Sequence, residues 1–122
     1  MFLELKCGGQ LSGETGIFTS PNFPNYYAPN TFCEWNIQVP AGKSVKVKFS
    51  NFLLSELGQE NTKDCNKDYV EINNKRYCGE PTSSPVVTSD TNTMKVVFNS
   101  DASYVDRGFS ARYETFESTD RK

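Results

Sequence analysis

Four cysteines and the absence of histidine constrain this 122-residue chain more than any other feature. No two cysteines form a C-x-x-C pair, which argues against a zinc knuckle or a thioredoxin-like redox site. An even, widely spaced set in a small domain indicates two disulfides and an oxidising compartment. Three pairings are possible, and the sequential one closes the shortest loops. Each bridge is expected to contribute about 3 kcal/mol by restricting the unfolded chain. The cysteines are Cys7, Cys33, Cys65 and Cys78.

The lack of histidine also excludes several functions. No Ser-His or Cys-His nucleophilic pair and no histidine-ligated metal site can form within this chain, and no catalytic residue is expected. The net charge of −2 is unlike the basic footprint of a nucleic-acid-binding domain. No apolar run approaches the roughly 18 residues of a transmembrane helix, so direct membrane insertion is not expected. Residues 1–6 are too short and too charged for a signal peptide, which suggests a piece of a longer chain.

Alternation of apolar and polar residues at period two is the main secondary-structure signal. Short strands of this kind, separated by turn residues, predict two antiparallel sheets packed face to face. One weak helical pattern covers Leu53 to Leu57. The strands are expected at 34–39, 45–49, 69–72, 86–88, 94–98 and 109–113. The expected core residues are Trp35, Ile37, Val47, Phe49, Val96, Phe98, Phe109 and Tyr113.

Four stretches, in order and at family-like spacing, resemble the signature of the CUB domain. They are Cys7-Gly8-Gly9 followed by residues 16–27, the segment 33–40 that begins Cys-Glu-Trp, the segment 65–72 followed by Tyr77-Cys78-Gly79, and residues 98–103 followed by Gly108-Phe109. The resemblance implies an all-β, jelly-roll-like sandwich of about ten strands. It also implies the sequential disulfides Cys7–Cys33 and Cys65–Cys78. We expect the domain to span 7–116, with 1–6 as a linker or expression start and 117–122 as a C-terminal linker.

Within this family, residues 67–73 and 103–109 are most similar to CUB repeats of type II transmembrane serine proteases of the matriptase kind. The resemblance implies a non-catalytic protein-recognition module, extracellular and either secreted or part of a cell-surface ectodomain. Its partners would be another extracellular protein and the neighbouring domains of its own chain. Two alternatives remain open: a purely structural spacer, and a carbohydrate-binding module of the spermadhesin type.

Many CUB domains bind Ca²⁺ through one Glu and two Asp, since Ca²⁺ prefers several oxygen ligands. By resemblance, Asp68 and Asp101 match the two Asp positions, Ser103 could add its backbone carbonyl, and Tyr27 matches a Tyr that hydrogen-bonds the acidic cluster. The departure is Glu56, which falls one residue after the usual Glu position. A slip of one residue in a strand would turn its side chain away, and a loop or bulge could bring it back.

The expected partner contact follows from the charge left at such a site. The resemblance to the family implies that carboxylates at the rim attract a Lys or Arg of a partner protein. Loss of such a charge-assisted pair reduces the free energy of binding by about 2–5 kcal/mol. Aromatic residues in predicted loops could add to this contact or fold back to pack the loops. These residues are Tyr26 and Tyr104, together with Phe23 and Phe52.

Overall fold

The computed structural model describes residues 6–54, 65, 67–79, 85–102 and 105–117. This part of the chain forms nine β-strands and contains no helix long and apolar enough to cross a membrane. The strands are β1 (Lys6–Ser12), β2 (Thr15–Thr19), β3 (Phe32–Gln38), β4 (Ser44–Leu53), β5 (Tyr69–Ile72), β6 (Lys75–Tyr77), β7 (Val86–Thr88), β8 (Thr93–Asn99) and β9 (Gly108–Phe116).

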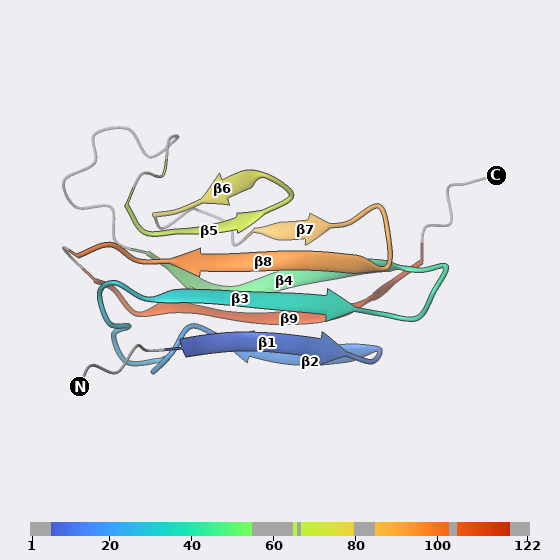
Figure 1. Ribbon diagram of the computed structural model, residues 1–122, viewed down its shortest axis with the longest axis horizontal. Coiled ribbons are helices and arrows are strands. Elements are labelled where there is room, and N and C mark those ends of the chain that lie inside the picture. Colours follow the sequence, from blue (N-terminus) through green and yellow to red (C-terminus); the bar gives the residue numbers. More distant parts are fainter. Residues whose placement is uncertain (1–5, 55–64, 66, 80–84, 103–104, 118–122) are drawn as a thin grey trace.

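Two sheets run along the long axis of the molecule and stack on each other (Figure 1). One has five strands in the order β1-β3-β8-β5-β6, and the other has four in the order β2-β9-β4-β7. All pairings are antiparallel except that of β1 with β3. The predicted all-β, jelly-roll-like sandwich is confirmed, with nine strands in the described residues against the ten or so implied.

The inner faces of both sheets carry the apolar members of each alternating strand. All eight residues expected in the core are buried. Phe109 on β9 lies at the centre of an aromatic cluster, with ring centroids 5.4 to 6.0 Å from those of Phe18, Trp35, Phe49 and Phe98. Because two of these four neighbours come from each sheet, Phe109 joins the two layers.

Two expectations about the end of β4 were wrong. The pairing of β4 with β9 shifts register between Phe49 and Asn51, and an extra residue of this kind changes which positions face inward. Phe52 is therefore a buried strand residue whose ring lies 5.2 Å from that of Phe49, and not a loop aromatic. Leu53, expected to begin a short helix, is the last residue of β4; the rest of that pattern lies outside the described residues.

Both disulfides have the sequential pairing. Cys7 bonds to Cys33 and Cys65 bonds to Cys78, with Cα–Cα distances of 4.7 and 5.7 Å that lie within the usual range. Cys7 and Cys33 are also register partners in the parallel pairing of β1 with β3. The first bridge thus fixes the edge strand β1 to the five-stranded sheet.

Candidate functional site

Three strands of the five-stranded sheet end together at one end of the sandwich, and each carries a buried polar residue there. Thr31 precedes β3, Ser100 follows β8 and Asp68 precedes β5, and all three are at most 3% exposed. Each lies two residues beyond the last inward-facing residue of its strand and therefore faces inward as well. A polar group at an inward position needs hydrogen-bond partners, since burial without them is costly.

Asp68 is the centre of this group, with an exposed fraction of 0%. The hydroxyl of Tyr27 donates a hydrogen bond to its Oδ2 over 2.5 Å, and the backbone N–H of Asp101 donates to its Oδ1 over 2.9 Å. Tyr27 is itself buried, packs edge-on against Phe98 at 5.1 Å and donates its backbone N–H to the carbonyl of Asp106. The aromatic core therefore positions the carboxylate.

Burial raises the pKa of Asp68 above its ordinary value, because an ionised carboxylate is poorly solvated there. The hydrogen bonds from Tyr27 and from the backbone of Asp101 act in the opposite direction, and the nearby Asp101 carboxyl raises the pKa further. Two carboxyl groups thus face the same small volume, and one of them is fully buried. Such an arrangement favours a proton or a bound cation.

This pKa shift predicts how stability depends on pH in calcium-free buffer. Between the ordinary pKa of 3.8 and the raised pKa, the folded chain binds more protons than the unfolded chain. The free energy of unfolding should therefore fall as pH rises through that interval. Asp68→Asn should remove this fall, since an amide can accept from the Asp101 N–H and donate to the Tyr27 hydroxyl. Urea unfolding of both proteins from pH 3.5 to 7 measures the difference, and a pH-independent difference would contradict the prediction.

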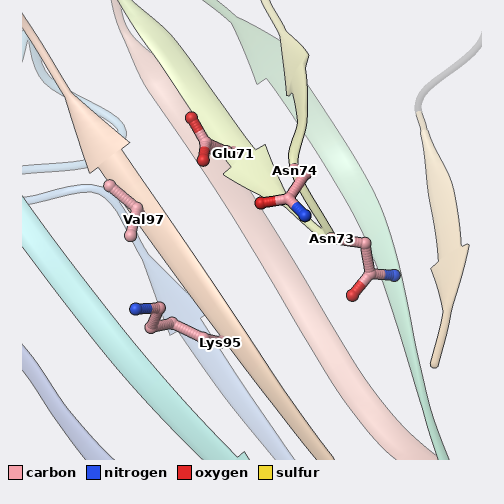
Figure 2. Close-up of a pocket in the computed structure, with 5 residues that line it drawn as sticks. All are labelled: Glu71, Asn73, Asn74, Lys95 and Val97. Carbon is pink, nitrogen blue, oxygen red and sulfur yellow. The ribbon is translucent and has the colours of Figure 1, made fainter. Parts of the chain in front are cut away.

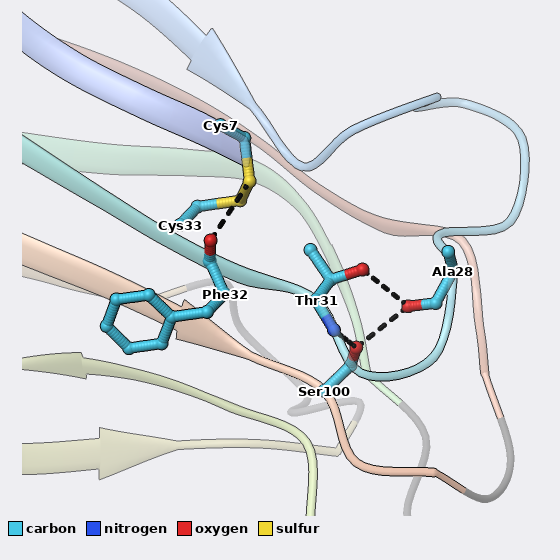
Figure 3. The surroundings of a disulfide bond; sticks show 6 residues. All are labelled: Cys7, Ala28, Thr31, Phe32, Cys33 and Ser100. Carbon is cyan, nitrogen blue, oxygen red and sulfur yellow. Dashed lines mark hydrogen bonds between the residues drawn. A yellow bond between two sulfur atoms is a disulfide. The ribbon is translucent and has the colours of Figure 1, made fainter. Parts of the chain in front are cut away.

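A second set of hydrogen bonds ties the neighbouring segments together beside the first disulfide (Figure 3). The carbonyl of Ala28 accepts from the hydroxyls of Thr31 and Ser100, both at 2.8 Å, and Ser100 Oγ accepts from the backbone N–H of Thr31 at 2.9 Å. Cys33 lies two residues beyond Thr31. Residues 27–31 and 99–101 are thereby fixed relative to Asp68.

The structure brings together three of the predicted site residues, namely Asp68, Asp101 and Tyr27. Tyr26 is next in sequence and is 57% exposed, as a partner contact requires. Glu56, Ser103 and Tyr104 lie outside the described residues. Within the described residues, no three acidic, cysteine or histidine side chains form a possible metal cluster.

Thr31 and Ser100 were missed by the sequence analysis, although a signal for them existed. Thr31 is two residues before Cys33 and four before Trp35, so it falls on the same inward face of the strand. Ser100 is in the same relation to Phe98 and Val96. Extending each inward alternation by one residue predicts a buried hydroxyl at both positions. Asp68, before Val70, follows the same rule.

These features define a class of protein: a disulfide-linked β-sandwich whose polar site lies at one end and is built by hydrogen bonding. A scan of family models matches residues 7–113 to the CUB domain. The chain belongs to the CUB family. Its members are non-catalytic protein-interaction modules of extracellular and cell-surface proteins, so this chain is an extracellular module of that kind.

Individual relatives agree with this assignment. The chain is 46% identical over 94% of its length to the suppressor of tumorigenicity 14 protein homolog of Bos taurus, a matriptase, and 35% identical over 95% to cubilin of Rattus norvegicus. It spans only 13% and 3% of those two proteins. The matriptase likeness expected from residues 67–73 and 103–109 is therefore confirmed.

Solved structures show the same fold. The extracellular region of zebrafish Gpr126/Adgrg6 matches with a TM-score of 0.77 and 34% identity, over 89% of this chain and 14% of that one. The CUB2 domain of MASP-1 bound to Ca²⁺ matches with a TM-score of 0.73 and 26% identity, over 87% of this chain and 96% of that one.

Proposed function

We propose that this CUB domain binds Ca²⁺ at the Asp68 and Asp101 end of the sandwich and there recognises a Lys or Arg of a partner protein. The observation that carries the proposal is the buried Asp68 carboxylate, which faces a second carboxyl group at a site built by hydrogen bonding. The MASP-1 CUB2 domain, similar in fold, is described as bound to Ca²⁺.

The donor chemistry of the described residues suits a hard cation. Asp68 and Asp101 supply carboxylate oxygens, and Tyr27 fixes one Asp68 oxygen through its hydroxyl. Extracellular calcium sites have dissociation constants of roughly 10⁻⁴–10⁻³ M. We propose Glu56 as the third carboxylate and the Ser103 carbonyl as a further ligand. A bound Ca²⁺ supplies positive charge that neutralises the buried carboxylates, and the carboxylate charge left at the rim attracts the partner's cation.

Asp101→Ala tests the metal site. In 10 mM Ca²⁺ the wild-type melting midpoint should rise by roughly 5–10 °C by mass action, given the affinity above. The variant should show no such rise, because it lacks one of the two described carboxylates. Differential scanning calorimetry with and without Ca²⁺ measures the shift. Asp90→Ala, an exposed Asp between β7 and β8, is the matched control and should keep the wild-type shift.

Three outcomes decide between the proposals. An equal calcium shift in Asp101→Ala and wild type would place the ion elsewhere. No shift in wild type would favour the structural spacer. An equal shift in Mg²⁺ would indicate unspecific charge neutralisation, because Mg²⁺ demands a smaller octahedral cage.

We also propose that the domain spans 7–116 and belongs to the ectodomain of a modular serine protease, with 1–6 and 117–122 leading to neighbouring segments. The 46% identity to a matriptase over 94% of the chain supports this. Partner contacts by Tyr26 and Tyr104 are part of the same proposal.

A further inference from the structure

We propose that the partner segment binds in an extended conformation along the outer face of β8. It places an apolar side chain between Phe32 and Tyr69, two positions along the partner from the Lys or Arg that contacts Asp101. This inference rests on the proposed function and adds a second recognition element to it. It assigns a sequence preference to the partner: a Lys or Arg, one intervening residue, and then an aliphatic residue.

The three strand ends that carry the buried polar residues also carry an outward row. Phe32 on β3 and Tyr69 on β5 are both register partners of Asn99 on β8. Phe32 is 54% exposed, and its ring points away from the Cys7–Cys33 disulfide in Figure 3. Two aromatic side chains therefore flank Asn99 on the outer face, directly beside the acidic site.

The next outward row continues this surface. Val97 on β8 is the register partner of Glu34 on β3 and Glu71 on β5. Diagonal neighbours across strands lie within reach of aromatic side chains, so Val97 extends the apolar surface between Phe32 and Tyr69. Glu34 places an acidic group on one side of this row, which complements a basic partner, whereas Glu71 on the other side forms an ion pair with Arg76.

Tyr69 is held in place before any partner binds. The guanidinium of Arg76 lies 4.0 Å from the centroid of the Tyr69 ring, while its Nε donates to Glu71 Oε1 at 3.1 Å and its Nη1 donates to the carbonyl of Cys65 at 3.2 Å. The second disulfide anchors Cys65 in turn. A ring fixed in this way loses little conformational freedom on binding, which favours affinity.

The spacing along β8 sets the partner motif. Val97 and Asn99 are outward residues of β8, one step of roughly 6.5 Å apart. Asp101 follows two residues later, just past the end of β8, where its backbone carbonyl still accepts a hydrogen bond from the N–H of Asn30 beside β3. An extended partner segment has the same repeat and also presents alternate side chains on one face. When the partner's Lys or Arg contacts Asp101, the partner residue two positions away therefore lies over Asn99, between the side chains of Phe32 and Tyr69.

The outer face beyond Val97 is hollowed, which leaves room for the segment to continue. A cavity of about 180 Å³ is lined by Glu71, Asn73, Asn74, Lys95 and Val97 (Figure 2). It forms where β5 ends at Ile72 and β8 still has residues to pair with β3. The hollow shares Glu71 and Val97 with the outward row next to Asn99.

Two matched peptides test the inference on the 122-residue chain with saturating Ca²⁺. The first is acetyl-Gly-Gly-Lys-Gly-Leu-Gly-Gly-amide, and the second has Ser in place of Leu. Amide chemical-shift titration by NMR gives both affinities. The Leu peptide should bind about tenfold more tightly, because partial burial of one aliphatic side chain increases affinity by about that factor. Its shifts should include the amides of Phe32, Tyr69 and Val97.

Phe32→Ser should reduce this Leu advantage to within about twofold and leave the affinity for the Ser peptide unchanged, because the basic contact is intact. Ile17→Ser is the matched control: Ile17 is 66% exposed on the other sheet, and the advantage should persist. Equal wild-type affinities for the two peptides, or an advantage that survives Phe32→Ser, would overturn the inference alone. Failure of both peptides to bind would refute the proposed function and this inference with it.

Discussion

Phe109→Ala is expected to lower the free energy of unfolding by about 3–5 kcal/mol, the range for removing a buried phenyl group from a core that cannot collapse around the cavity. The Phe109 side chain is fully buried and contacts aromatic rings from both sheets. With total stabilities of 5–15 kcal/mol typical of such domains, this is a large fraction of the whole.

Urea unfolding followed by the fluorescence of the single Trp, Trp35, measures this loss. The same chemical change at an exposed site, Phe32→Ala, is the control and should stay within about 0.5 kcal/mol of wild type. Comparable losses in both variants would mean that Phe109 does not join the sheets as described. Because Phe98 contacts both Phe109 and Tyr27, Phe109→Ala should also weaken the calcium shift.

Gly8→Ala is expected to have the second large effect, through the backbone of the edge strand β1. Gly8 has a φ of +99°, and a Cβ there would lie 2.1 Å from the backbone carbonyl oxygen of Glu34 on β3. A backbone atom in a sheet cannot move aside cheaply, so the substitution must push β1 away from β3. The disulfide at Cys7 opposes this separation. We expect a loss of more than about 3 kcal/mol, above the 1–3 kcal/mol of backbone strain alone.

Gly13→Ala separates the steric clash from the backbone strain. Gly13 has a φ of +112°, and nothing lies within 4 Å of the position of a Cβ there. This variant should therefore lose only the strain contribution, about 1–3 kcal/mol. Equal losses at Gly8 and Gly13 in urea unfolding would show that the close approach of β1 to β3 is not limiting. Hydrogen exchange should show the extra loss in Gly8→Ala as reduced protection along β1.

Local patterns were sufficient for six of the nine strands in the described residues and for the eight core residues expected from them, whereas β1, β2 and β6 were missed. Alternation depends only on which side of a pleated strand each residue faces, a property of neighbouring residues. The buried positions in β3 and β8 follow directly from it. The misplacement of Phe52 arose at a bulge in β4, which has no side-chain signature in this segment.

The site could be predicted only in part. Resemblance to the CUB family indicated Asp68, Asp101 and Tyr27, yet no local rule relates residues 33 and 41 positions apart. They meet because the strand order β3-β8-β5 places three strand ends side by side. The same order places Phe32 and Tyr69 on either side of Asn99. Glu56, displaced by one residue, stays a prediction.

Four cysteines and period-two alternation were enough to predict the class of fold, because they leave few other folds for a chain of this length. Which polar residues meet at one end, and which outward residues share one row, could be learned only from the folded chain. Strand order and register are set by packing two whole sheets together, and no short segment contains that information.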